Sequence, residues 1–203
     1  MDLTRYGLES EPLVQKSIKS GASVACFSGD KLIGGPQSGI IVGQADILAK
    51  IKKNPLKRAF RCGKMTIAAL EATLKLFLNP EKLNDRHPVY RMLSLTTESL
   101  MKRARRLERR LKQRLPEGTS IRIQDGGSEV GSGSVPAQTL PTKLVSIKSP
   151  RFSADNLAKR LRLNRPPIFT RILKEEVVFD LRTIQPGKDT AVEEALARIL
   201  SQP

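Results

Sequence analysis

The sequence contains no tryptophan, one histidine and two cysteines, and aromatic residues make up 4% of its 203 residues. So few aromatic rings argue against recognition of single-stranded nucleic acid by base stacking. His87 has no second His or Cys at ligand spacing, so we expect no metal site. It also has no partners spaced for a hydrolytic triad, and we expect it to lie on the surface or in a linker. Cys26 and Cys62 form no CxxC pair, and we expect both to be free thiols in a reducing cytoplasm. Cys26 lies in an apolar run that is expected to be a buried strand.

Long apolar runs are also missing. No run approaches about 18 residues, the length needed to cross a bilayer. The first residues, Met-Asp-Leu-Thr-Arg-Tyr, are not typical of a signal peptide. We therefore expect a cytoplasmic protein with no membrane partner. The phosphate-binding pattern GxxxxGK[ST] is absent too, which argues against a P-loop nucleotide site.

Acidic residues are in deficit. Lys and Arg number 36 against 20 Asp and Glu, which gives a net charge of +16. This balance favours a polyanionic partner, with nucleic acid first and an anionic membrane surface second. Basic residues are densest in a helix that is expected over 96–115 and capped by Thr96. Eight basic side chains surround a leucine stripe there. Contact with an RNA backbone and simple solvation both explain this face, whereas its narrow stripe without aromatics disfavours a membrane surface.

Helical and strand-like periodicities alternate along the chain, which predicts an α/β protein. The expected strands are 23–27, 39–43, 121–124, 143–148, 168–172 and 177–181. The expected helices begin near Pro12 and at Asp189, and cover 45–52, 65–78, 96–115 and 153–161. We expect the apolar stripe of 65–78 to be core. The polar, proline-bearing segment 79–90 suggests a division into domains 1–82 and 83–203.

One stretch, residues 27–43, carries a lysine between two apolar runs. Lys31 is expected in a loop between two buried strands. Burial disfavours the ammonium form and frees the amine as a nucleophile. Lysines that form Schiff bases need such an environment.

This stretch resembles a known motif. Ser-Gly-Asp-Lys-Leu-Ile-Gly-Gly-Pro-Gln-Ser-Gly, residues 28–39, is similar to the pyridoxal-phosphate lysine motif of bacterial selenocysteine synthases, the L-seryl-tRNA(Sec) selenium transferases. Residues 54–61 match that family's Asn-Pro-Leu-x-Arg-Ala-x-Arg pattern, although Gly63 stands where the family usually has Asp. Segments 126–136, read on this basis as an ordered loop, and 179–183 are similar to the family's small domain.

The resemblance implies a fold, a cofactor and site residues. The fold would be the C-terminal part of the large domain of a fold-type-I pyridoxal-phosphate transferase, followed by a small α/β domain. Lys31 would hold pyridoxal 5′-phosphate and shuttle a proton, with Ser28 also at the cofactor and Asp30 orienting a reactive group. Arg58 and Arg61 would bind anionic groups of the substrate or the selenium donor, a role suited to planar, permanently charged guanidinium groups.

It also implies partners. The family converts seryl-tRNA(Sec) to selenocysteinyl-tRNA(Sec) with selenophosphate and assembles as a ring of dimers. Its chains are about twice as long as this one, and the resemblance covers their C-terminal half. We therefore expect the phosphate-binding turn and the partner of the pyridine nitrogen to lie outside this sequence, leaving the cofactor pocket of the chain alone incomplete.

Two alternatives remain open at this point. A non-catalytic, basic tRNA- or RNA-binding fragment accounts for the charge. A related pyridoxal-phosphate lyase accounts for the lysine motif, although the match over 54–61 favours the synthase.

Overall fold

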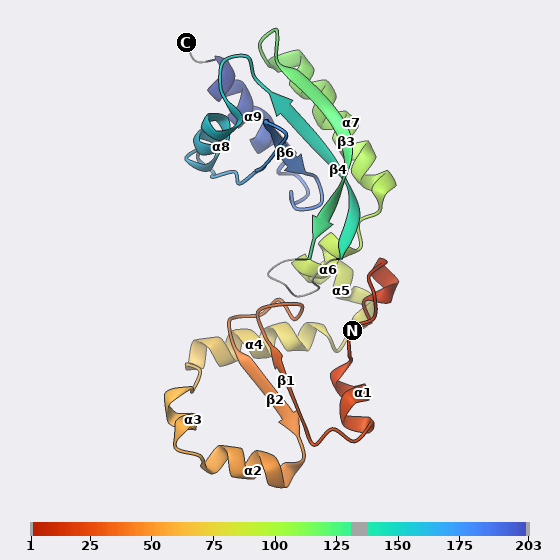
Figure 1. Cartoon of the computed structure of the whole chain (residues 1–203), viewed down its shortest axis with the longest axis vertical. Helices are drawn as coiled ribbons and strands as arrows, with labels where there is room; N and C mark the ends of the chain where they lie inside the picture. Colours follow the sequence, from red (N-terminus) through yellow and green to blue (C-terminus); the bar gives the residue numbers. More distant parts are fainter. Residues whose placement is uncertain (1, 131–137, 202–203) are drawn as a thin grey trace. The chain divides into compact units, whose positions relative to one another are not determined.

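The computed structural model describes residues 2–130 and 138–201, and its α/β character confirms the predicted fold class (Figure 1). The chain forms two compact units. The first unit comprises 1–94 with 130–138, and the second comprises 95–129 with 139–203. The compact units divide after Ser94, whereas the domain division after residue 82 stays a prediction. Among the described residues, no helix has the length and apolar character needed to cross a membrane.

The first unit is built around a two-stranded antiparallel hairpin. Strand β1 (Val24–Ser28) pairs with β2 (Gly39–Gly43), with Val24 opposite Gly43 and Ser28 opposite Gly39. The described residues of this unit form the helices α1 (Val14–Lys19), α2 (Ala45–Lys53), α3 (Leu56–Ala59), α4 (Lys64–Leu76), α5 (Leu83–Arg86) and α6 (Pro88–Leu93). Short 3-10 helices cover Thr4–Tyr6 and Pro80–Lys82.

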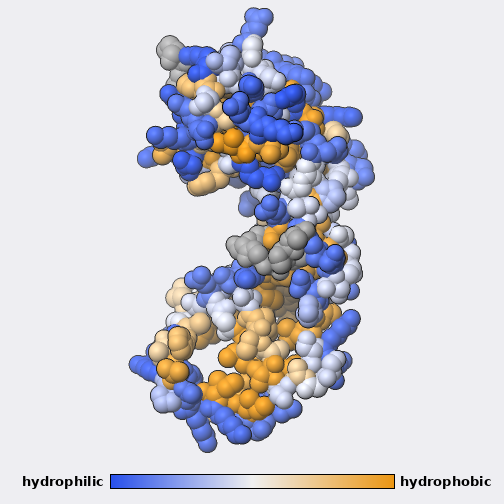
Figure 2. Space-filling model, viewed as in Figure 1, coloured by the Kyte–Doolittle hydropathy of each residue, from blue (hydrophilic) through white to orange (hydrophobic). Residues whose placement is uncertain are grey.

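The buried core of the first unit lies at its N-terminal segment and in α5 and α6. Its buried apolar side chains are Leu3, Leu8, Leu83, Tyr90 and Leu93. Neither hairpin strand nor α4 contains a buried residue, so the expectations of two buried strands and a core stripe on α4 are wrong. A two-stranded hairpin is too small to bury both of its faces. Figure 2 shows the resulting apolar surface.

The second unit contains a four-stranded antiparallel sheet in the order β3-β4-β6-β5. The strands are β3 (Ser120–Glu129), β4 (Thr139–Lys148), β5 (Arg171–Leu173) and β6 (Glu176–Asp180). Ile121 lies opposite Ile147, which in turn lies opposite Val177, so alternate apolar residues share one face. They form one core with buried residues of α7 (Thr97–Arg114), α8 (Ala154–Arg162) and α9 (Asp189–Ser201).

Local signals place the helix starts of this unit correctly. The side chains of Thr96 and Ser153 accept hydrogen bonds from the backbone N–H groups of Ser99 and Asn156, both at 3.3 Å, as N-caps do. The expected loop over 126–136 is wrong in its first part, because Gly126–Glu129 continue β3. The rest of that segment, from 131, lies outside the described residues. Strand β5 begins at Arg171, three residues later than predicted.

Candidate functional site in the lysine loop

The loop that joins β1 to β2, residues 29–38, carries Lys31 and is called here the lysine loop. Its ends are tied together, because the Gly29 N–H donates to the Ser38 carbonyl at 2.8 Å and the Gly35 N–H donates to the Gly29 carbonyl at 2.8 Å. Within it, the Gly34 N–H donates to the Lys31 carbonyl at 2.8 Å and closes a tight turn. Lys31 therefore sits on a backbone of defined shape.

The lysine loop packs against α4. Gly29 is buried, and a β-carbon there would lie 2.2 Å from Ser38 Oγ and 3.3 Å from Leu70 Cδ1. A β-carbon on Gly35 would also meet Leu70, again at 3.3 Å. At Gly29 the prohibitive contact is with Ser38 of the loop itself, whereas the contacts to Leu70 are tight but involve the end of a side chain. Glycine at position 29 is therefore explained mainly by the close approach of the two ends of the loop.

The other predicted residues of this loop lie next to Lys31. Ser28 is half-buried at the end of β1, and Asp30 is exposed on the turn. Lys31 is exposed too, so the expected burial of its amine is wrong for this structure. Cys26, opposite Ile41 in the hairpin, is exposed as well, so its expected place in a buried strand is also wrong.

His87 lies beside the lysine loop, where the sequence did not place it. It is 1% exposed, and its Nε2 lies 2.9 Å from the carbonyl oxygen of Ile33 in the lysine loop. Its ring packs edge-on against Phe77 and Tyr90, with centroid separations of 5.6 and 5.1 Å. The expectation of a surface histidine is therefore wrong, because a contact 54 residues away in sequence buries it. The polar segment around it gave no sign of this contact.

The two predicted arginines lie before α4. The Asn54 side chain accepts a hydrogen bond from the Leu56 N–H at 2.9 Å, which starts the short helix α3 that contains Arg58. Arg61 follows α3. Both arginines are exposed, and neither forms an ion pair with a described residue. They are available to an external anion.

Helix α4 connects these two groups of residues. It starts after its N-cap Gly63, two residues beyond Arg61, and meets the lysine loop at Leu70. At a rise of 1.5 Å per residue, these points lie about 10 Å apart along the helix. No described contact joins Lys31 to Arg58 or Arg61.

Gly63 stands where the family that the sequence resembles usually has an aspartate. A β-carbon on Gly63 would meet no atom within 4 Å, so an aspartate would fit there as a helix cap.

The Phe-Asp-Leu-Arg-Thr segment of the second unit is structural. Buried Asp180 accepts hydrogen bonds from Ser128 Oγ at 2.6 Å, Thr142 Oγ1 at 2.8 Å and the Arg182 N–H at 3.0 Å. Arg182 donates to the carbonyls of Leu95 and Pro141 at 2.9 and 2.7 Å. Burial lowers the pKa of Arg182, and the Asp180 carboxylate opposes that effect. This network links β3, β4 and β6.

About half of the basic side chains of α7 are neutralised within the second unit. Arg103 bonds Asp189 at 2.7 Å, Arg110 and Arg114 share Glu193 at 2.9 Å each, and Lys112 pairs with Glu108 at 2.8 Å. The exposed side chains without an ion pair to a described residue include Arg105, Arg106 and Arg109. These three form the basic face of α7.

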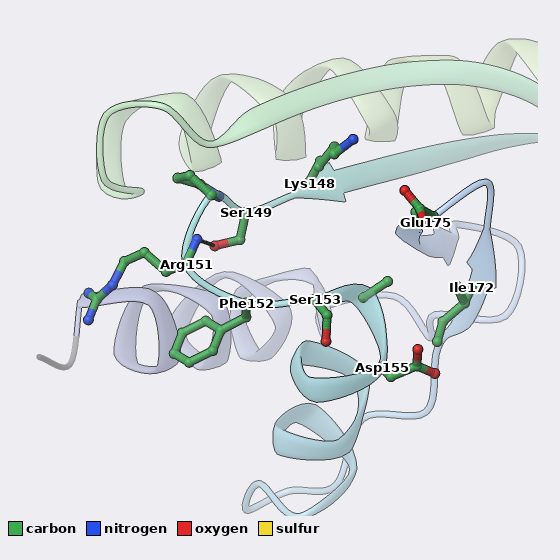
Figure 3. A pocket seen from close by; sticks show the side chains of 10 residues that line it. Lys148, Ser149, Arg151, Phe152, Ser153, Asp155, Ile172 and Glu175 are labelled. Atoms are coloured by element: carbon green, nitrogen blue, oxygen red, sulfur yellow. Dashed lines mark hydrogen bonds between the residues drawn. The ribbon is translucent and has the colours of Figure 1, made fainter.

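A pocket of about 420 Å³ lies at the start of α8 (Figure 3). Lys148 and Arg151 line it together with Asp155 and Glu175, so its charges are balanced and we assign it no ligand. No predicted site residue belongs to it. Within residues 2–130 and 138–201, no three His, Cys, Asp or Glu side chains are placed to hold a metal ion.

Comparison with known proteins gives one consistent result. Residues 1–185 match the family model described as L-seryl-tRNA selenium transferase. The chain is 46% identical over 199 residues to the L-seryl-tRNA(Sec) selenium transferase of Alkaliphilus metalliredigens, covering 98% of this chain and 42% of that protein. The proteins of the same name from Alkaliphilus oremlandii and Clostridium botulinum (strain 657) are 44% and 38% identical over 200 residues, covering 98% of this chain and 43% of each. The chain thus spans less than half the length of these relatives.

Proposed function

Because the chain belongs to the L-seryl-tRNA selenium transferase family, we propose that it contributes to the conversion of seryl-tRNA(Sec) to selenocysteinyl-tRNA(Sec), with pyridoxal phosphate and selenophosphate. The observation that carries this proposal is the shaped turn that presents Lys31, within a sequence 46% identical to a named selenium transferase. The family assignment favours this reaction over that of a related lyase.

The residues present fit the proposed cofactor in chemical type. Lys31 offers an exposed primary amine, the group that would hold the cofactor at its aldehyde. Arg58 and Arg61 offer two exposed guanidinium groups without ion-pair partners among the described residues, suited to an oxyanion. When bound, pyridoxal phosphate supplies an electron sink for the electrons released at the seryl α-carbon.

Each residue has a proposed part in the reaction. Lys31 would take up the α-proton of the seryl group and return a proton to the departing β-hydroxyl, so that one molecule of water is lost. Asp30 orients a reactive group next to Lys31, and Ser28 hydrogen-bonds the cofactor. Arg58 and Arg61 hold an anionic group of selenophosphate or of the tRNA substrate. Cytoplasmic location and assembly as a ring of dimers belong to the same proposal.

The proposal is tested by trapping. The chain is incubated with pyridoxal phosphate and reduced with borohydride, and the modified lysines are located by peptide mass spectrometry. We expect Lys31 to be modified faster than Lys50, Lys52 and Lys53 of exposed α2, which serve as internal references. Lys31→Arg should lose the modification at 31 alone. Equal modification of all these lysines would contradict the assignment.

A second candidate function, binding of RNA, is favoured by one observation. The basic face of α7 presents Arg105, Arg106 and Arg109 without intramolecular ion pairs to described residues, whereas four other basic residues of the helix are paired. Free guanidinium groups on one helix are suited to phosphate contacts. In the proposed reaction, this face would contact the backbone of the tRNA substrate.

A further inference from the structure

The imidazole of His87 has both nitrogens engaged in the first unit. The backbone N–H of Val89 donates to Nδ1 at 3.2 Å, so Nδ1 carries no proton. Nε2 lies 2.9 Å from the Ile33 carbonyl oxygen, an acceptor, so the ring proton is on Nε2 and is donated to the lysine loop. One neutral tautomer therefore satisfies both contacts. The first contact caps α6, and the second fixes the loop.

The loop backbone also lies against the ring itself. Gly34 has a φ of +66°, and a β-carbon there would lie 2.4 Å from His87 Cε1 and 3.2 Å from Val89 Cγ2. The same Gly34 donates its N–H to the Lys31 carbonyl. His87 thus contacts Ile33 and lies against Gly34, the residue whose N–H closes the turn carrying Lys31.

From this arrangement we propose that His87 is a positioning residue for Lys31: its Nε2–H bond to the Ile33 carbonyl holds the 31–34 turn in the shape that presents the lysine amine. The inference rests on the proposed role of Lys31 as the cofactor lysine. The contact itself involves only residues of the first unit and is testable without the cofactor.

Two substitutions separate the functions of the imidazole nitrogens. In His87→Asn the amide oxygen can take the place of Nδ1 and keep the cap on Val89, but the side chain is too short to reach Ile33. In His87→Gln the amide nitrogen can take the place of Nε2 and keep the bond to the loop, but the cap is removed. The pair therefore differs in which contact survives, while both remove the ring.

The first measurement is amide hydrogen exchange by mass spectrometry on the 203-residue chain. The N–H groups of Gly29, Gly34 and Gly35 are hydrogen-bonded in the loop and report its order. Loss of one such bond corresponds to about a tenfold change in an equilibrium, so we expect roughly tenfold faster exchange over 29–38 in His87→Asn. In His87→Gln, residues 29–38 should exchange at about the same rate as in the unsubstituted chain, and the start of α6 should exchange faster.

Tyrosine fluorescence tests whether the first unit of each variant is folded, because Tyr6 and Tyr90, the two tyrosines of the chain, lie in that unit. Equal exchange of the loop in the Asn and Gln variants would overturn the proposal and leave His87 as a packing residue. Unchanged exchange in the Asn variant would overturn it as well.

The second measurement is trapping of pyridoxal phosphate at Lys31 in the same proteins. We expect the rate at Lys31, relative to the α2 lysines, to fall in His87→Asn and to be largely retained in His87→Gln. If pyridoxal phosphate shows no preference for Lys31 in the unsubstituted chain, the proposed function fails. The exchange result then still decides whether His87 fixes the turn. If Lys31 is preferred equally in all three proteins, the positioning role fails alone.

Discussion

At the residue scale, Tyr90 shows how burial changes proton binding in the first unit. Its side chain is 2% exposed and packs among Tyr6, Phe77 and His87. Burial raises the pKa of Tyr90 to about 12, and the nearby Tyr6 adds to the rise. The folded state therefore binds more protons than the unfolded state between the ordinary pKa of 10.0 and about 12.

We accordingly predict that the free energy of unfolding of the first unit falls as the pH rises through this window. The stabilisation is fully present below pH 10 and is lost as the folded Tyr90 ionises. An ultraviolet absorbance titration measures the ionisation of Tyr90 that underlies this loss, because the chain contains two tyrosines and no tryptophan. Tyr90→Phe should remove the later ionisation. Ionisation of both tyrosines near pH 10 in the folded chain would contradict the prediction.

The close approach of Gly34 to His87 leads to a second residue-scale prediction. Gly34→Ala combines a left-handed backbone, φ +66°, with a β-carbon 2.4 Å from the ring. Gly21→Ala is the matched control, because Gly21 also has a positive φ, +101°, but its β-carbon would meet nothing within 4 Å. We expect about 1 kcal/mol of destabilisation for the control and about 2 kcal/mol or more for Gly34→Ala, since overpacking adds to strain. Urea unfolding followed by tyrosine fluorescence provides the comparison.

At the scale of elements, the Asp180 network joins three strands of the second unit. Asp180→Asn keeps the shape of the side chain but replaces one acceptor oxygen with an NH2 group. At the Oδ1 position this group faces the backbone N–H of Arg182, and at the Oδ2 position it faces the guanidinium group of Arg171, which lies 3.5 Å from Oδ2. We expect a loss of about 2 kcal/mol, the cost of an unsatisfied buried polar group. Asp125→Asn is the control, because Asp125 is 84% exposed in its pair with Lys143 and exposed pairs contribute about 0–1 kcal/mol. Thermal unfolding by circular dichroism measures both, and equal stability of the two variants would contradict the expected difference.

The basic face of α7 supports a prediction about RNA. Changing Arg105, Arg106 and Arg109 to Gln lowers the net charge from +16 to +13 (16 − 3 = 13). If these side chains bind phosphates, the slope of log affinity against log salt falls by roughly 0.7–0.9 for each phosphate that is no longer bound. A variant with Lys50, Lys52 and Lys53 changed to Gln has the same net charge and should bind more tightly than the α7 variant. Filter binding of tRNA over a salt series makes the comparison, and equal slopes would contradict an RNA-binding role for this face.

Sequence reasoning succeeded where the determining contacts are local. The starts of α7 and α8 follow from Thr96 and Ser153, whose side chains bond N–H groups three residues away. The strand over Gly39–Gly43 has its predicted bounds. The continuation of β3 through Gly126–Glu129 was missed because Gly and Ser are typical of loops, whereas ladder hydrogen bonds to β4 use only the backbone.

The position of Lys31 was predictable from the sequence, but the surroundings of the lysine loop were not. Lys31 lies in the expected loop between two strands. Its exposure, and the burial of His87, depend on which distant segments pack together, and one sequence contains little information about that. A positive φ at Gly34 and a close approach at Gly29 are consistent with the Gly-rich loop, but their partners, His87 and Leu70, appear only in three dimensions.

At the scale of the whole molecule, the large apolar side chains left exposed are numerous in the first unit. Phe60, Met65 and Leu78 are 79%, 83% and 77% exposed. Apolar surface of this kind marks a contact surface or an aggregation hazard. We therefore predict that the chain alone associates as its concentration rises, as measured by sedimentation velocity.

Substitution of Phe60, Met65 and Leu78 by Ser should reduce this association markedly. The control changes Leu163 and Phe169 of the second unit, which are 72% and 78% exposed, to Ser. We expect the control to have a smaller effect, because its side chains belong to a unit with a well-covered core. A chain that stays monomeric at every concentration would contradict the prediction.

The solitary histidine has a spectroscopic consequence. Since the sequence contains one imidazole and that imidazole bonds the lysine loop, a nuclear magnetic resonance spectrum of the ¹⁵N-labelled chain contains one pair of ring-nitrogen signals. Their chemical shifts distinguish the Nε2–H tautomer from the other two protonation forms. Any ligand, partner or longer chain that moves the loop should shift these signals, so the molecule carries its own reporter beside Lys31 without an added label or substitution.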